Sequence, residues 1–200
     1  MKIIVIEGKA CSGKGTIAKK LAKQIKYTYI DAGLIFRSVM YPKEINSKVE
    51  YFWKNGKSFI FIEGIDVTRN LSTLEIGYIT TKKASTKKGF MLLANEVKRI
   101  SKKYDKIIID GTGMKEIIFN EAKRFYLKAP LNIRAERRLK HLLEQGIKVN
   151  YSSVYKNLKY RDKKDLERNF CPLRVPKDAI DTSKKTIEEC VEIIKGEILC

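Results

Sequence analysis

The sequence has few of the residues that build metal clusters or disulfide frameworks. Its cysteines are Cys11, Cys171, Cys190 and Cys200, with no C-x-x-C pair among them, and His141 is the single histidine. Structural zinc sites need four such ligands, usually at short spacings, so we expect no metal cluster of this kind. Scattered thiols suit a reducing compartment, and we therefore expect a cytoplasmic protein.

Long hydrophobic runs are also missing. No stretch approaches the roughly 20 apolar residues of a membrane-spanning helix, so we expect no membrane partner. The first residues have the pattern of a strand and not that of a signal peptide. With 44% hydrophobic residues in a chain of 200, there is enough apolar material for the core of one α/β domain.

Acidic residues are scarce relative to basic ones. The 23 Asp and Glu stand against 42 Lys and Arg, which gives a formal net charge of +19. An excess of this size is one mark of nucleic-acid binding. The lysines, however, are spread along the chain, and no module combines basic with aromatic residues. We interpret most of them as a compositional bias of the surface and do not expect nucleic acid as a partner.

The most informative feature that is present is a glycine-rich turn, GKACSGKGT, at residues 8–16. The β-branched run at 2–7 predicts a buried strand before it, and residues 16–26 have apolar positions at helical spacing after it. A glycine-rich turn between a strand and a helix is the setting of a phosphate-binding loop. The strict pattern G-x-x-x-x-G-K-[ST] fails at one position, because Gly15 is inserted before Thr16. The G-K-G-T form is typical of nucleotide kinases.

The chemistry of such a loop explains its residue types. Glycines let successive N–H groups point into one concavity, and the helix N-terminus adds partial positive charge there. Lys14 supplies a full charge for the β- and γ-phosphates, and the Thr16 hydroxyl is placed to hold Mg²⁺. We predict that the whole loop binds ATP: Gly8, Lys9, Ala10, Cys11, Ser12, Gly13, Lys14, Gly15 and Thr16.

Five buried-strand patterns recur along the chain, at residues 2–7, 27–31, 106–110, 124–128 and 179–181. Helical patterns separate most of them, which favours an α/β fold with a parallel sheet.

Two segments interrupt this alternation. The stretch YFWKNGKSFIFIEGIDVT alternates in polarity and turns at Asn55 and Gly56, which predicts a hairpin or small antiparallel sheet. A helix-rich arm dense in Arg and Lys follows Pro130, which we place in the first turn of a helix, and Gly146 stands where that helix should stop.

Four further motifs appear in the order of a known family. DAGLIFR matches D-S-G-x-x-[YF]-R, and IFIEGIDVTRNLST resembles the strand and G-x-D-V-[ST] stretch of a monophosphate-binding insert. IRAERR resembles the arginine-rich start of a lid, and RDKKDLERNFCPLRVPKDAIDTS resembles R-D-x-x-D-x-x-R…P-L…D-A…D-[ST]. Over roughly residues 2–194, the chain resembles the bacterial-type cytidylate kinases of the nucleoside monophosphate kinase family.

The resemblance implies a P-loop NTPase core with a five-stranded parallel sheet, a small antiparallel acceptor-binding insert and a short helical lid. It divides the single domain into a core at about 1–40, 85–130 and 172–200, an insert at about 42–84 and a lid region at about 131–171. It implies transfer of the γ-phosphate of Mg·ATP to CMP or dCMP, so the partners are ATP and a nucleoside monophosphate and the cofactor is Mg²⁺. We expect a monomer.

The family's chemistry also assigns roles to residues. Phosphoryl transfer needs several cations around two charged phosphates, and a planar guanidinium suits a phosphate better than an ammonium does. By resemblance, the predicted catalytic residues are Lys14, Arg137, Arg138 and Arg161. Arg134 is predicted to bind ATP in addition to the loop residues. The predicted acceptor-binding residues are Asp31, Arg37, Thr81, Arg161, Asp165 and Arg168, and the metal-binding residues are Thr16 and Asp110.

Simpler interpretations exist for several of these residues. Asp31 is also a predicted helix N-cap. The arginines of IRAERR, and the helical stripe Arg161, Asp165 and Arg168, would be solvated helix faces if they stood alone. The phosphate-binding loop makes us prefer the functional interpretation.

The sequence departs from the family in the acceptor pocket. Thr112 and Gly113 stand where the family has the arginine and aspartate of G-R-D, and Ala32 replaces the serine of D-S-G. In the family, that arginine holds the acceptor phosphate and that aspartate reads cytosine. A further base-reading arginine is expected where this chain has Phe90.

Some neighbouring residues are candidates to compensate. Thr81 stands for the family's base-contacting serine and keeps a hydroxyl, and Lys82 or Lys115 could replace the lost arginine as a point charge. Two alternatives stay open: a kinase for UMP, another nucleoside monophosphate or a different small acceptor, and a relative that binds nucleotide or RNA without turnover. The sequence specifies neither the base nor the preference for ribose or deoxyribose.

Overall fold

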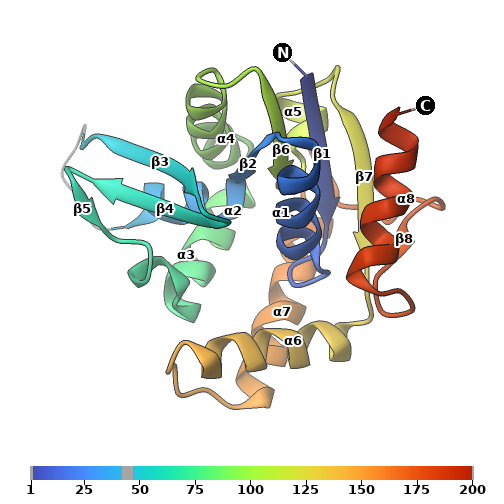
Figure 1. Cartoon of the computed structure of the whole chain (residues 1–200). Coiled ribbons are helices and arrows are strands. Elements are labelled where there is room, and N and C mark those ends of the chain that lie inside the picture. The colour runs from blue at the N-terminus through green and yellow to red at the C-terminus, as the bar shows by residue number, and fades with distance from the viewer. Residues whose placement is uncertain (1, 42–46, 200) are drawn as a thin grey trace.

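The parallel sheet predicted from the sequence is present. A computed structural model describes residues 2–41 and 47–199, so residues 42–46 of the predicted insert lie outside the described residues. The strand order is β2-β6-β1-β7-β8, and every pairing is parallel (Figure 1). The predicted strands are confirmed with ends shifted by at most one residue: β1 (Lys2–Gly8), β2 (Thr28–Asp31), β6 (Lys106–Asp110), β7 (Lys123–Lys128) and β8 (Ile180–Asp181).

Helices cover both faces of this sheet. On one face lie α1 (Lys14–Ile25) and α8 (Ile187–Leu199), and on the other lie α2 (Ala32–Met40), α4 (Lys87–Ser101) and the short α5 (Met114–Ile117) (Figure 1). The central strand β1 supplies both cores because successive side chains point to opposite faces. Ile4 and Ile6 pack in the cluster of α1 and α8, whereas Val5 packs in that of α2 and α4.

The strand register brings chemically active residues to one edge. Ile6 of β1 pairs with Asp110 of β6, and Asp31 of β2 pairs with the same Asp110. The carboxyl ends of these parallel strands therefore meet beside the turn that follows β1, which is where open α/β sheets place their ligands.

The antiparallel sheet projects from the core at the left of Figure 1. It consists of β3 (Val49–Lys54), β4 (Lys57–Ile62) and β5 (Ile65–Asp66). The hairpin predicted at Asn55 and Gly56 is confirmed, and both residues have positive φ, 52° and 75°. A 3₁₀ turn (Asn70–Ser72) and α3 (Leu74–Ala84) lead the chain back to the core.

The arginine-rich arm forms α6 (Leu131–Glu144) and α7 (Tyr151–Leu166), which lie below the carboxyl ends of the strands in Figure 1. Pro130 is the N-cap of α6 and not, as predicted, a residue of its first turn. Gly146 lies just beyond the end of α6 with φ of 77°, as predicted. Because α7 ends at Leu166, Arg168 lies beyond the helix and not on the predicted helical stripe.

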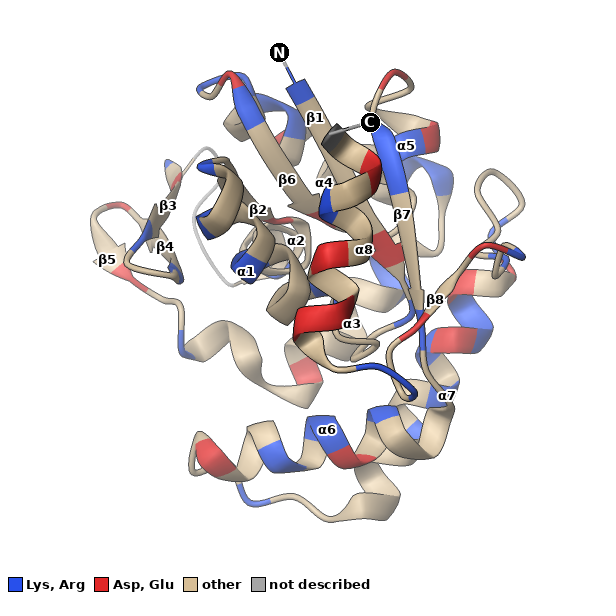
Figure 2. Cartoon of the chain, turned by 45° about the vertical axis from the view of Figure 1, so that its right-hand side comes forward, with Lys and Arg blue, Asp and Glu red and all other residues tan. Residues whose placement is uncertain are grey.

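The charge of the chain is distributed as its sequence suggested. Lys and Arg occur on the core, on the antiparallel sheet and on the arm (Figure 2). None of the described helices has the length and apolar character of a membrane span.

Candidate active site

The glycine-rich turn has the backbone geometry of an anion-binding loop. β1 ends at Gly8, where φ is 138° and a Cβ would lie 2.1 Å from the Leu127 carbonyl oxygen, so only glycine fits. Cys11 and Gly13 also have positive φ, 62° and 95°, and Gly13 is the N-cap of α1. No side chain caps this helix N-terminus, which leaves its first amides available to a phosphate.

Lys14 and Asp110 form the centre of the site. The Lys14 Nζ donates to the Lys9 carbonyl oxygen at 3.0 Å and lies 3.8 Å from Asp110 Oδ1. The Tyr29 hydroxyl donates to Asp110 Oδ2 at 3.3 Å. Burial raises the pKa of Asp110, and Lys14 opposes that rise. A Cβ at Gly15 would lie 3.1 Å from Asp110 Oδ2, which gives a physical reason for the inserted glycine.

Two cavities meet at this centre. The inner cavity, of about 300 Å³, lies between the loop, α2, α3 and α7. The outer cavity, of about 520 Å³, lies between the loop, α1, α6 and the start of α8. Both are lined by Cys11, Lys14, Gly15, Asp31, Asp110, Arg138 and His141. Two ligands bound in these cavities would therefore come together beside Lys14 and Asp110.

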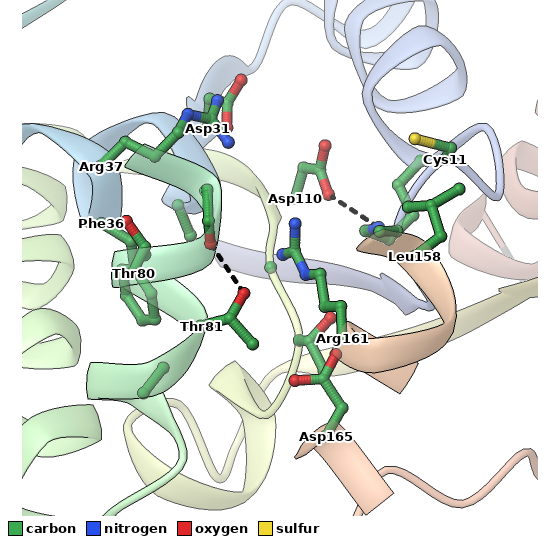
Figure 3. A pocket seen from close by; sticks show the side chains of 18 of the residues that line it. Cys11, Asp31, Phe36, Arg37, Thr80, Thr81, Asp110, Leu158, Arg161 and Asp165 are labelled. Carbon is green, nitrogen blue, oxygen red and sulfur yellow. Dashed lines mark hydrogen bonds and ion pairs between the residues drawn. The ribbon is translucent and has the colours of Figure 1, made fainter. Parts of the chain in front are cut away.

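The predicted acceptor residues gather in the inner cavity (Figure 3). Its lining includes all of them: Asp31, Arg37, Thr81, Arg161, Asp165 and Arg168. Asp31 is also the predicted N-cap, because its carboxylate accepts from the Leu34 amide at 2.8 Å.

The inner cavity concentrates positive charge that protein groups do not fully neutralise. Burial lowers the pKa of Arg37; Asp31 opposes this and Arg161 adds to it. Burial also lowers the pKa of Arg138, and the charges of Arg37 and Arg161 lower it further. The Arg37 Nε is buried and has no hydrogen-bond partner among the described residues. An anion with several oxygens is the ligand that would relieve this repulsion.

Arg134 is not brought to either cavity. It is 2% exposed and makes a bidentate ion pair with Asp162 of α7, at 3.1 and 2.6 Å. It also donates to the carbonyl oxygens of Ala129, at 3.0 Å, and Ala10, at 3.2 Å. These contacts join α6, α7 and the phosphate-binding loop to one another.

The other two arginines of α6 point to different partners. Arg137 lines the outer cavity and donates to the Oγ1 and carbonyl oxygen of Thr182, at 2.9 and 2.8 Å. The Thr182 hydroxyl in turn donates to the Ser12 carbonyl oxygen at 2.8 Å. Arg138 lines both cavities and donates to the Ser72 carbonyl oxygen at 3.0 Å.

The loop residues also separate into two groups. Cys11, Gly13, Lys14, Gly15 and Thr16 line the outer cavity, where Thr16 is exposed. The remaining loop residues line the inner cavity or face elsewhere: Ala10 lines the inner cavity, the Lys9 ammonium lies 3.3 Å from Asp162, and Gly8 and Ser12 support the backbone.

The departures from the family pattern lie in or beside the wall of the inner cavity: Ala32, Thr112 and Phe90 line it, and Gly113 lies next to Phe90. The Thr112 hydroxyl donates to the Gly8 carbonyl oxygen at 3.0 Å, so it braces the loop. Gly113 has φ of 76°, and a Cβ there would lie 3.1 Å from Cys171 Sγ and 3.2 Å from Phe90 Cζ. Phe90 is fully buried. The space around Gly113 is therefore closely packed by Phe90 and Cys171.

Neither lysine suggested as a replacement for the lost arginine lies in position to replace it. Lys82 is exposed, and the Lys115 ammonium donates to the Asn120 carbonyl oxygen at 2.7 Å. Neither is among the described residues that line the cavities. Ala32 is buried and lines the inner cavity without a polar group.

Sequence reasoning assigned no role to three residues of this network. Asp162 anchors Arg134, Thr182 anchors Arg137, and Tyr29 binds Asp110. Asp162 and Thr182 were visible as the second residue of R-D and the threonine of D-T-S, whereas nothing in the sequence marked Tyr29.

The fold defines the class of protein first. The structure is similar to that of shikimate kinase from Bacteroides thetaiotaomicron, with a TM-score of 0.53, 14% identity and coverage of 100% of this chain and 99% of that one. At this identity the likeness shows the fold alone, which is that of the kinases with a phosphate-binding loop.

The sequence comparisons then identify the family. The cytidylate kinase family matches residues 4–198. Cytidylate kinase from Thermodesulfovibrio yellowstonii is 31% identical, over 98% of this chain and 97% of its own length. That from Clostridium botulinum is 34% identical, over 96% and 94%. The chain belongs to the cytidylate kinase family.

Proposed function

We propose that this protein transfers the γ-phosphate of Mg·ATP to CMP or dCMP and so forms CDP or dCDP. The observation that carries the proposal is the meeting of the two cavities at Lys14, Asp110 and Arg138. ATP in the outer cavity would present its γ-phosphate to an acceptor phosphate in the inner one. An oxygen of the acceptor phosphate then forms a bond to the γ-phosphorus as the bond to ADP breaks.

The residues beside the loop fit a magnesium ion. Asp110 offers a half-buried carboxylate; burial and the charge of Asp31 nearby raise its pKa, and a cation would oppose that rise. No cluster of three or more acidic, His or Cys residues occurs in the described part of the chain. Mg²⁺ commonly takes one or two carboxylates and otherwise substrate phosphates and water. We assign Asp110 and Thr16 to its shell, where the ion would neutralise charge on the phosphates.

On the donor side, Lys14 and the loop amides hold the β- and γ-phosphates, and Arg137 lies along the outer cavity beside Thr182. For Arg134 we propose a supporting role. Its guanidinium is occupied by Asp162 and by the loop carbonyl of Ala10, so it fixes the loop against the lid helices and does not itself bind ATP.

On the acceptor side, Arg37, Arg138 and Arg161 surround the phosphate that receives the transferred group. Their mutual repulsion favours binding of an anion, because phosphate oxygens can accept from these guanidinium groups, among them the buried Nε of Arg37. The same cations stabilise the negative charge spread over the transferring group. Asp165 and Arg168 contact the rest of the acceptor.

The hydroxyl of Thr81 supports cytosine as the base. It donates its hydrogen to the Gly77 carbonyl oxygen at 2.8 Å, and the neighbouring Thr80 hydroxyl donates to the Ile76 carbonyl oxygen at 2.7 Å. Each hydroxyl has only one hydrogen, so the oxygens of these two residues, which line the inner cavity, keep only acceptor capacity for a ligand. The exocyclic amino group of cytosine is a donor, whereas uracil presents an acceptor oxygen at that position. A threonine hydroxyl thus takes over part of the task of the missing aspartate.

The test is a panel of acceptors. Purified protein is mixed with Mg·ATP and separately with CMP, dCMP, UMP and AMP, and formation of ADP and of each diphosphate is followed, with Lys14→Ala as the control for contaminating kinases. We expect rapid, Lys14-dependent turnover with CMP or dCMP. Turnover with a different acceptor alone would overturn the substrate assignment. No turnover with any acceptor would favour a protein that binds nucleotide without transfer.

The cytoplasmic location and monomeric state that we propose are checked separately, by fractionation and by sedimentation.

A further inference from the structure

Phe90 occupies an unusual position in the inner cavity wall. Its ring is fully buried, makes an edge contact with Phe36 at 5.6 Å between ring centroids, and packs against Phe170 at 5.5 Å. Phe36 precedes Arg37 on α2, and Phe170 follows Arg168 beyond α7. One aromatic side chain therefore joins the two segments that carry the acceptor arginines.

Arg168 depends on this ring. Its guanidinium carbon lies 5.0 Å from the Phe90 centroid, and the residue is 6% exposed. The Nη2 donates to the Asp165 carboxylate, but Nε and Nη1 are buried without a hydrogen-bond partner among the described residues. Burial lowers the pKa of Arg168, and Arg161 adds to the effect. The negative face of the ring is a favourable contact for this cation, because the two unpartnered nitrogens have no acceptor among the described residues.

The same ring crowds the position where the family has its aspartate. Its Cζ would lie 3.2 Å from a Cβ at Gly113, and Cys171 Sγ would lie at 3.1 Å. An aspartate at 113 and a phenylalanine at 90 therefore compete for one space. The two departures from the family pattern therefore lie side by side, at positions to which the family assigns a base-reading arginine and a base-reading aspartate.

We propose that Phe90 is a positioning residue for the acceptor: its ring face holds the Arg168 guanidinium at the wall of the inner cavity, in the orientation in which Arg168 meets the nucleoside monophosphate. Phe90 itself touches no reacting atom. The inference rests on the proposed function, because it takes the inner cavity as the acceptor site.

The test compares Phe90→Leu with the wild type in steady-state kinetics. Leucine keeps the apolar volume but has no π face. We expect the KM for CMP to rise about tenfold, while kcat and the KM for ATP stay within about twofold. Phe119→Leu is the matched control, because Phe119 is 6% exposed in the same hydrophobic cluster and does not line the cavity. Should Phe90→Leu fail to fold, Phe90→Met replaces it.

A double-mutant cycle separates positioning from loss of packing. If Phe90 acts through Arg168, then Phe90→Leu added to Arg168→Met changes the KM for CMP by less than about twofold. If the changes in KM for CMP of the two single variants multiply in the double variant, or if Phe90→Leu leaves this KM unchanged, the inference is wrong. Turnover of CMP by the wild type would still support the proposed function. A wild type that does not phosphorylate CMP would remove both together.

Discussion

The two ends of the inner cavity differ in how they are built. The phosphate end has Lys14, Arg37 and Arg161, which match the family pattern, beside the half-buried carboxylates of Asp31 and Asp110. The base end has Phe90 and Gly113 in place of charged residues. A phosphate end must supply cations at fixed places, since nothing else stabilises the transferred charge. A base end needs shape and a few hydrogen bonds, so its wall can be repacked around a different set of side chains.

The largest effect should come from removing the charge at the phosphate end. Lys14→Ala removes the lysine of the phosphate-binding loop, which lines both cavities, and we expect kcat/KM to fall by at least about 10³-fold, measured as CDP formation. Lys20→Ala is the control on the same helix, because Lys20 pairs with Glu188 away from the loop. Equal losses in both variants would mean that the loop does not hold the donor phosphates.

Arg37→Met should weaken binding of the acceptor and increase the stability of the protein. Because burial lowers the pKa of Arg37 and its buried Nε has no partner among the described residues, its charge is unfavourable in the protein without ligand. We expect the KM for CMP to rise about 10²-fold and the free energy of unfolding to increase by about 1 kcal/mol. Kinetics and urea denaturation measure the two quantities. A variant that is both less stable and unchanged in KM would contradict the electrostatic account.

Restoring the family's carboxylate should fail at the base end. Gly113→Asp places a side chain at φ of 76° against Cys171 and Phe90, and we expect a loss of about 3 kcal/mol of stability with no gain for CMP over UMP. Gly146→Asp is the matched control, since Gly146 has φ of 77° and open space around it. It should lose only about 1 kcal/mol. Similar losses in urea denaturation would show that the wall is not closely packed.

The smallest effect concerns the support beneath the base end. Glu7 is 2% exposed and accepts from the Lys115 amide at 3.4 Å, and burial raises its pKa from 4.5 to about 7. The folded protein thus keeps a proton that the unfolded chain releases, so this residue lowers stability as pH rises from about 4.5 to 7.

Glu7→Gln should remove that pH dependence. We expect the variant to gain about 2 kcal/mol relative to the wild type between pH 5 and pH 8, measured by urea denaturation at both values. A difference between variant and wild type that does not change with pH would show that Glu7 titrates normally.

The sequence predicted the parts that follow from local patterns. The five strands, the turn at Asn55 and Gly56 and the N-cap at Asp31 depend on periodicity or on one residue's backbone preference. The gathering of Arg37 and Arg161 in one cavity followed from motifs that the family shares.

Other features depend on partners far away in the chain. Arg134 and Arg138 lie one turn apart on the same face of α6, but Arg134 forms an ion pair with Asp162, whereas Arg138 lies where the cavities meet. The contact of Phe90 with Arg168 joins residues 78 positions apart by sequence number, and no periodic pattern signals it. The direction of the Thr81 hydroxyl depends on its hydrogen bond to the Gly77 carbonyl oxygen, which the sequence does not show.

The most direct test of the account is the ratio of kcat/KM for CMP to that for UMP, measured in the wild type, in Thr81→Val and in Thr81→Ser. The account predicts a ratio of at least about tenfold in the wild type and in Thr81→Ser, and a fall toward one in Thr81→Val, which keeps the shape but removes the acceptor oxygen. A wild type that uses UMP as well as CMP, or a ratio that valine leaves unchanged, would contradict the claim that a rebuilt base end still selects cytosine.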